Sequence, residues 1–142
     1  MRLAARFALG VCVMAGLLPA CSGSHHDSVN LQPALESPIA DVPIPVGFAM
    51  TSDSTSKVEA TGIRFVDHKY SGSDDVLPVV RFYTQQMPGK GWTFVNQNQQ
   101  VNNEIALHYT KNSEDCMVTV TSGSLHTHIR VQIDPAGRNA AR

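Results

Sequence analysis

The sequence predicts an α+β fold, a two-layer sandwich in which one main helix packs on a twisted antiparallel sheet. Two observations carry this prediction. Several short stretches after residue 61 alternate apolar and polar side chains, as strands with one buried face do. A single stretch between them has helical spacing instead, and no strand-helix-strand unit repeats, so the pattern does not indicate a parallel sheet.

The chain divides into four predicted regions. Residues 1–20 read as a signal peptide, 21–45 as an anchored, flexible tether, 46–135 as one α+β domain, and 136–142 as a frayed tail. The tether is predicted because its residues are mostly Ser, His, Asp, Asn, Gln and Pro, a composition typical of extended linkers.

Two strands are expected before the helix. Residues 46–50 form a short apolar stretch that suits an edge strand, and the Ser- and Thr-rich residues 51–56 suit a loop. Residues 61–70 alternate, with Val66, His68 and Tyr70 on one face.

The helix is expected to begin at Ser73 or Asp74, whose side chains can accept hydrogen bonds from the free amides of a first turn. Phe82 lies outside the apolar stripe, so the spacing alone leaves it either core or exposed. The apolar stripe consists of Val76, Val79, Val80, Tyr83 and Met87.

Four strand-like pieces follow the helix, at 92–95, 104–110, 116–121 and 125–133. Gly123 and Ser124 suit a two-residue type II′ turn between the last two. That turn pairs Val118 with Ile129 and places Leu125 and Cys116 on the apolar face.

The first residues have the features of a targeting signal. Arg2 and Arg6 precede the apolar run 7–18, which is too short to span a bilayer and suits a signal peptide. The run ends in Leu18-Pro19-Ala20-Cys21, which resembles the lipobox of bacterial lipoproteins, with Pro19 as a departure from the usual small or aliphatic residue.

The lipobox resemblance implies that the mature chain begins at Cys21 and carries a diacylglycerol thioether and an amide-linked acyl chain. Several acyl chains hold a protein firmly on a bilayer, which would be the first partner. Ser22 follows the cysteine, and in such lipoproteins a residue other than Asp there usually permits export to the outer membrane. We therefore expect a lipid-anchored protein on the periplasmic face of the cell outer membrane.

Charge and cysteine content exclude two classes. Without its signal peptide the chain has nine basic and twelve acidic residues, a net charge of about −3, and no basic run, so nucleic acid is not an expected partner. Of the three cysteines, Cys12 leaves with the signal and Cys21 is acylated. Cys116 then has no intramolecular partner, which excludes a disulfide scaffold.

Three histidines are the sharpest candidates for chemistry. His126 and His128 lie two apart in a predicted strand and share its outward face with Arg130, while His108 faces outward on another strand. If the two strands are neighbours, the three imidazoles could hold zinc or copper. A solvated sheet face would give the same pattern, and the sequence leaves both interpretations open.

A second resemblance covers residues 70–92. It is similar to an F-Y-x-x-x-M-P-x-x-G-W arrangement in small bacterial lipoproteins and secreted domains of uncharacterised role, and it brings no activity with it. A fold role accounts for this signature, which consists of Tyr70, Gly72, Phe82, Tyr83, Met87, Pro88, Gly91 and Trp92.

The sequence contains no G-x-S-x-G elbow and no phosphate-binding glycine loop. It therefore predicts a protein that is not an enzyme and that needs no cofactor beyond its lipid. The expected role is a binding or envelope-assembly accessory whose partner is an envelope protein or a cell-wall component, with a metal-binding or metal-sensing lipoprotein as the alternative.

Overall fold

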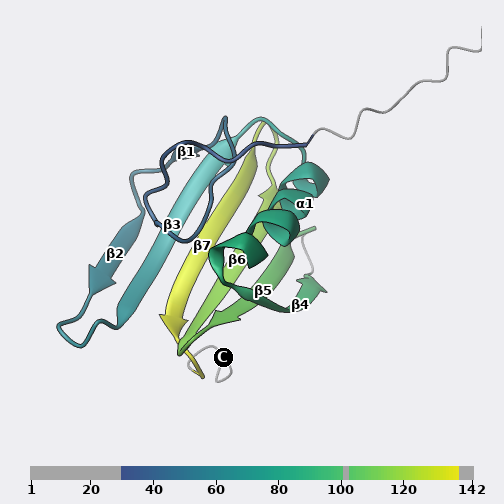
Figure 1. Cartoon of the computed structure of the whole chain (residues 1–142). Helices are drawn as coiled ribbons and strands as arrows, with labels where there is room; N and C mark the ends of the chain where they lie inside the picture. The colour runs from purple at the N-terminus through teal and green to yellow at the C-terminus, as the bar shows by residue number, and fades with distance from the viewer. Residues whose placement is uncertain (1–29, 101–102, 138–142) are drawn as a thin grey trace, which may run out of the picture.

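A computed structural model describes residues 30–100 and 103–137 of the chain (Figure 1). Seven strands form one antiparallel sheet in the order β1-β3-β7-β6-β5-β4, and β2 also pairs with β3. The strands are β1 (Ala49–Met50), β2 (Thr55–Val58), β3 (Arg64–Gly72), β4 (Thr93–Gln99), β5 (Ile105–Lys111), β6 (Glu114–Ser122) and β7 (Thr127–Pro135).

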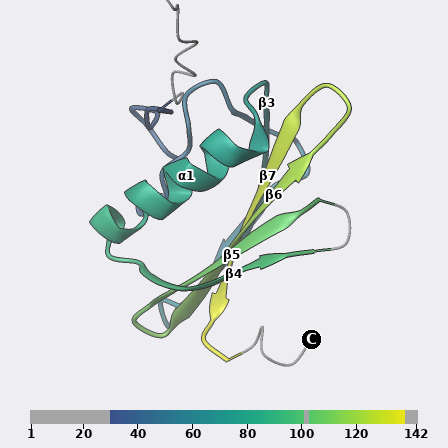
Figure 2. The same ribbon diagram turned by 90° about the vertical axis from the view of Figure 1, so that its right-hand side faces the viewer.

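The helix α1 (Val76–Gln86) packs over β6 on one face of the sheet, so the predicted α+β fold is confirmed (Figure 2). We call the face beneath α1 the inner face and the opposite one the outer face. Successive side chains of a strand point to opposite faces, and the alternate apolar residues of these strands therefore gather on the inner face. Its buried side chains are Val66, His68, Tyr70, Ile105, Leu107, Tyr109, Cys116, Val118, Val120, Ile129, Val131 and Ile133.

The helix buries Phe82 as well as most of its predicted stripe, while Val76 is only partly buried. Asp75 is the N-cap residue, and its side chain makes no capping hydrogen bond. Phe82, which the spacing left undecided, is buried and meets Tyr83 edge-on with ring centroids 5.2 Å apart. Pro88 begins the 3-10 helix Pro88–Lys90, which ends the helical segment.

The signature residues have structural roles. Gly91 adopts a left-handed φ of 86°, which glycine reaches without strain, and turns the chain so that Trp92 packs back into the core. At Gly72 an added Cβ would lie 2.7 Å from Cγ of Phe48, so only glycine leaves room for that ring. The fold therefore explains why these residue types occur here.

The prediction of a flexible tether up to residue 45 is wrong for residues 31–45, which we call the strap. The strap lies over the inner face beside α1 and buries Leu31, Ile39, Val42 and Ile44 in the core. Its two ends pair, since the amide of Ala34 donates to the carbonyl of Ile44. Prolines suggested an extended linker, but the few apolar residues between them are spaced to fill a gap in the core.

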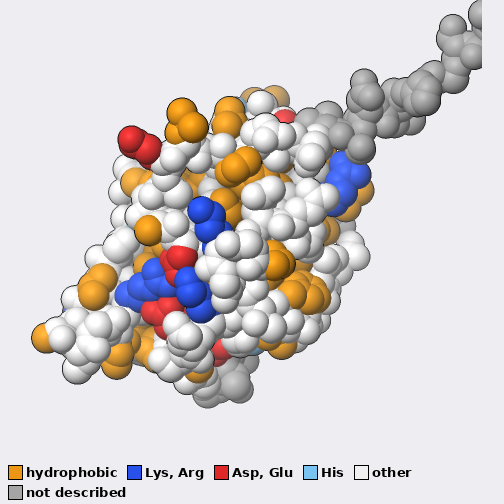
Figure 3. Space-filling view, in the orientation of Figure 1, with side chains coloured by type: hydrophobic (Ala, Val, Ile, Leu, Met, Phe, Trp, Pro, Cys, Tyr) orange, Lys and Arg blue, Asp and Glu red, His pale blue; other side chains and the backbone are white. Residues whose placement is uncertain are grey.

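Charged residues fasten the strap to the sheet. Arg64 of β3 donates two hydrogen bonds to Asp41, at 2.8 and 2.7 Å, and two more to Glu114 of β6. Lys111 of β5 donates to the same Asp41 carboxylate at 2.8 Å. The indole N–H of Trp92 donates to the Asp41 carbonyl. Acidic and basic side chains accordingly meet in one compact cluster in Figure 3, which we call the Asp41 latch.

The β6–β7 hairpin has a longer turn than the two-residue type II′ turn predicted. Ser122 pairs with Thr127, and the amide of Gly123 donates to the carbonyl of His126, so four residues form the loop. Val118 therefore pairs with Val131. A shift of two residues keeps every side chain on its predicted face, except that Leu125 now lies in the loop and is exposed.

Two local predictions also need correction. Residues 55 and 56, the end of the expected loop 51–56, belong to β2, because their backbone finds a partner in β3. Ala136 and Gly137, expected to begin a frayed tail, are held by hydrogen bonds from their amides to Ser113 and Asp115.

The strap makes a direct prediction about stability. Truncating Ile44, which is 3% exposed, should lower the free energy of unfolding by about 2–4 kcal/mol, because a core cavity remains. Leu35 of the same strap is fully exposed, so Leu35→Ala should change it by less than about 0.5 kcal/mol. Urea unfolding of both variants measures the difference, and equal small effects would mean that the strap is a tether after all.

The Asp41 latch predicts an acid dependence. Burial raises the pKa of Asp41, but hydrogen bonds from Arg64 and Lys111 outweigh it and lower the pKa to about 2. A carboxyl whose folded pKa lies below its unfolded value stabilises fully above the unfolded pKa, about 3.9. This contribution is lost as the pH falls from there through the folded value.

Wild type should therefore exceed Asp41→Asn in unfolding free energy by a constant amount above pH ~5, and the gap should close as the pH falls from about 4 to 2. Urea unfolding at several pH values measures the gap. Glu36→Gln changes an exposed carboxylate of the same strap and serves as the control. A gap that stays constant down to pH ~2 would contradict the assigned role of Asp41.

Candidate functional site

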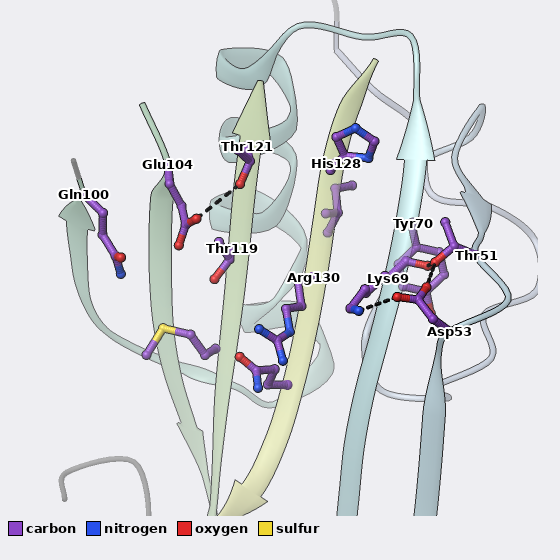
Figure 4. A pocket seen from close by; sticks show the side chains of 13 residues that line it. Thr51, Asp53, Lys69, Tyr70, Gln100, Glu104, Thr119, Thr121, His128 and Arg130 are labelled. Carbon is purple, nitrogen blue, oxygen red and sulfur yellow. Dashed lines mark hydrogen bonds and ion pairs between the residues drawn. The ribbon is translucent and has the colours of Figure 1, made fainter. Parts of the chain in front are cut away.

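The outer face of the sheet carries a groove of about 450 Å³ (Figure 4). Its walls come from β3, β7 and β6 and from residues next to β1, β4 and β5. Figure 4 shows Glu104 on one side and Lys69 with Asp53 on the other, with Thr119, Thr121 and Arg130 between them. The groove thus crosses the strands rather than running along one of them.

Strand alternation explains which side chains line the groove. Every second residue of β7 faces outward, which places His128, Arg130 and Gln132 in a row. Thr121 lies opposite His128 on β6, and Lys69 lies opposite Arg130 on β3. Polar residues at these positions keep the outer face hydrated while the intervening residues fill the core.

The cations on one side of the groove are paired. Arg130 holds Asp67 in a bidentate pair, with Nε–Oδ1 and Nη2–Oδ2 distances of 2.8 and 2.7 Å, and the hydrogen bond lowers the pKa of Asp67. Lys69 forms an ion pair with Asp53, whose pKa falls to about 2 through hydrogen bonds from Lys69 and Thr51. Because each cation has a carboxylate partner, this side is nearly neutral overall.

The other side of the groove is acidic and rich in amide and hydroxyl groups. Glu104 accepts a hydrogen bond from Thr121 at 3.5 Å, and Gln100 lies beside it at the end of β4. Met117 and Thr119 lie between the two sides on β6. A ligand here meets donors and acceptors of both signs and one thioether.

Residue types common in other kinds of site are missing from the described lining. Among the described residues that line the groove, none is a serine or cysteine, so no nucleophile of these types stands next to His128. No tryptophan or phenylalanine lines it either, among the same residues, and the ring of Tyr70 at its edge is buried, so the groove exposes little aromatic surface for stacking on a sugar.

The structure does not bring the three predicted histidines together. His108 on β5 lies level with Gln132 of β7, four residues from His128, so the two differ by about 13 Å along the strands and by two strands across the sheet. His126 lies in the hairpin loop. The Nε2 atom of His108 is 3.2 Å from Asp115 instead. No group of three His, Cys, Asp or Glu residues within residues 30–100 and 103–137 is placed to hold a metal.

Another histidine makes a contact that the sequence did not indicate. His68 hydrogen-bonds Ser56 through Nε2 and Tyr70 through Nδ1, the latter at 3.0 Å. A serine hydroxyl bound to a histidine ring resembles the nucleophile and general base of a hydrolase. His68 is buried on the inner face, however, and burial lowers its pKa. Neither His68 nor Ser56 lines the groove, so we assign the contact to fastening β2 onto β3.

The remaining predicted residues fall outside the groove, with one exception. Cys21 lies outside the described residues, and Cys116 is a free thiol with no exposed surface in the core. Of the signature residues only Tyr70 lines the edge of the groove; its hydroxyl lies on the inner face beside His68, where burial raises its pKa to about 12.

The sequence predicted the residues of one wall of the groove, the outward row on β7, but suggested the wrong chemistry for them. The outward row on β7 was visible from alternation, but its histidines suggested a metal. The other walls depend on which strands are neighbours. Lys69 and Glu104, on opposite walls, are separated by 34 residues of sequence, and nothing local indicates that they face one ligand.

The placement of the histidines makes a prediction about metal. Zinc or copper added at near-stoichiometric levels should bind equally to the wild type and to the variant carrying His108→Gln and His128→Gln, because these side chains cannot share an ion. Native mass spectrometry counts the bound ions. One ion bound tightly by wild type and lost from the variant would restore the metal-binding alternative.

In the comparison with known families, the family model described as START domain-like matches residues 49–137. The strap precedes this match, although it belongs to the same core. The curated proteins and the solved structures yield no significant match. In the part of the chain that the structure describes, no helix has the length and apolar character needed to cross a membrane.

Proposed function

The chain belongs to the START domain-like family, and on this premise we propose that it is a binding module of the bacterial envelope that holds a peptide in its outer groove. It acts by binding rather than by catalysis. Family membership suggests ligand binding in general. The observation that supports the groove as the site is its size, about 450 Å³, together with its mixed polar lining.

The chemistry of the groove favours a peptide over other ligands. A polyanion would need unpaired cations, but Arg130 and Lys69 are both neutralised by carboxylates. A glycan commonly stacks on an exposed aromatic ring, whereas Tyr70, at the edge of the groove, is buried, and the described lining contains no tryptophan or phenylalanine. A peptide backbone alternates donors and acceptors, and these match the amide of Gln100 and the hydroxyls of Thr119 and Thr121.

The peptide has two possible sources in the envelope, a protein segment or the peptide part of the cell wall. We further propose that acylation of Cys21 tethers the module to the periplasmic face of the outer membrane. The Leu18-Pro19-Ala20-Cys21 motif supports this anchor. Anchoring raises the local concentration of the module near envelope partners, so that a modest affinity of the groove suffices.

A groove-filling variant tests the site. Thr119→Trp places a large ring in the middle of the groove, and Thr84→Trp places the same ring on the exposed side of α1 as a control. Calorimetric titration with the peptide fraction of digested cell wall, and separately with peptides from envelope proteins, should show binding by wild type and by Thr84→Trp. We expect Thr119→Trp to bind at least about tenfold more weakly, a loss of about 1.4 kcal/mol.

The two peptide sources are distinguished by which fraction binds. Unchanged binding in Thr119→Trp would remove the groove as the site. An equal loss in both variants would point to a general effect of tryptophan on folding, which urea unfolding of each variant would reveal.

A further inference from the structure

Four of the exposed large apolar side chains belong to segments at one end of the domain and do not line the groove. Leu35 lies within the strap and Val46 follows its last residue, and they are 105% and 57% exposed. Leu77, in the first turn of α1, is 66% exposed, and Leu125, in the β6–β7 loop, is 83% exposed. We call these four residues the apolar rim.

The rim residues come from three segments that meet at one end of the domain. A Cβ built on Gly47, the neighbour of Val46, would lie 3.8 Å from Oδ2 of Asp74, just before α1. Asp74 in turn lines a small hollow of about 170 Å³ together with Leu125. The hairpin loop, the start of α1 and the end of the strap lie at the same end in both views (Figures 1 and 2).

The described chain begins at this same end. The amide of Val46 donates to the carbonyl of Gln32 at 2.9 Å, so the rim lies beside the first described residues. Cys21 precedes Asn30 by nine residues, which span at most about 30 Å when fully extended. The folding of the strap is what makes this distance short, since a tether up to residue 45 would have allowed a much longer reach.

We propose that the apolar rim is a membrane-contact surface, which rests the domain on the lipid bilayer that holds its acyl anchor. This inference depends on the anchor at Cys21 in the proposed function but not on the groove. Leucine and valine side chains at a bilayer interface gain from burial among the lipids. The nine residues hold the domain within about 30 Å of Cys21, and the rim lies at the end of the domain where they join it.

The charges beside the rim indicate which lipid surface it fits. Glu36, Asp74 and Asp75 are acidic and lie next to Leu35 and Leu77 in the sequence. An anionic bilayer would repel them, so the rim suits a zwitterionic surface and should dock through apolar contact rather than charge. Contact should therefore persist at high salt.

Docking through the rim would also orient the groove. β3 runs from the rim end, where it pairs with β1, to the far end, where Arg64 pairs with Val58. These two ends lie about 23 Å apart along the strand. With the rim on the bilayer the strands stand upright, and the groove opens sideways, free for a periplasmic ligand.

The far end supplies a matched control. Val58 is 68% exposed, nearly the same as Leu77, but lies at the opposite end of β3 from the rim. If exposed apolar side chains inserted into lipid regardless of the anchor, both ends would do so. The proposal predicts insertion at the rim alone.

The test uses the full chain purified from membranes, with its mass measured to count acyl chains, and reconstituted into phosphatidylcholine vesicles. Leu125→Cys and, separately, Val58→Cys carry one environment-sensitive fluorophore. Cys116 should not react with it, because it is fully buried and burial raises its thiol pKa. Spin-labelled lipids should quench the probe at position 125 several-fold more strongly than the probe at position 58. Insertion into the bilayer should also shift the emission of the probe at 125 further to the blue.

Adding Leu35→Ser and Leu77→Ser to the Leu125→Cys chain should reduce the quenching, and 1 M salt should leave it unchanged, because apolar contact is not screened. Equal quenching at positions 125 and 58 in an acylated chain would overturn the docking and leave the anchor standing. A mature chain without acyl chains would overturn both the anchor and the docking, while peptide binding by the groove would be unaffected.

Discussion

Complete burial of the inner sheet face is the constraint on which the rest of this structure depends. One helix of 11 residues cannot cover a seven-stranded sheet, so the uncovered part must find other apolar side chains. The strap supplies them and becomes part of the core. The Asp41 latch then holds the strap to β3 through Arg64 and to β5 through Lys111, while Glu114 of β6 holds the Arg64 side chain in place. The tether prediction failed because burial by a distant partner is invisible in a segment read alone.

Burying one face leaves the other available for function. The outer face needs polar residues at alternate positions for solubility, and the twisted sheet collects them in one groove. Pairing Arg130 with Asp67 and Lys69 with Asp53 removes most of the net charge there, so selectivity must come from hydrogen-bond geometry rather than from charge. This is why a peptide, with regularly spaced donors and acceptors, is the ligand that we propose.

The strap also connects the fold to the proposed anchor. Because Leu31 already belongs to the core, few residues lie between Cys21 and the core, and the proposed anchor would keep the domain near the bilayer. That end is the one with the exposed apolar rim, and the groove lies on a side of the sheet that such an arrangement leaves open. The core packing thus depends on the same short segment as the membrane contact and the open ligand site that we propose.

By itself the sequence determined the properties that depend on local periodicity. It determined the α+β class, the face on which the residues of β3, β5, β6 and β7 lie, and most of the buried stripe of α1. The faces were right even where the register of Val118 was wrong by two residues, because such a shift preserves the face. Tertiary structure alone decided the burial of Ile44, the pairing of β2, the separation of His108 from His128 and the assembly of the groove. Each of these depends on which strands become neighbours, and contacts between segments far apart in the chain leave no periodic signal in either segment.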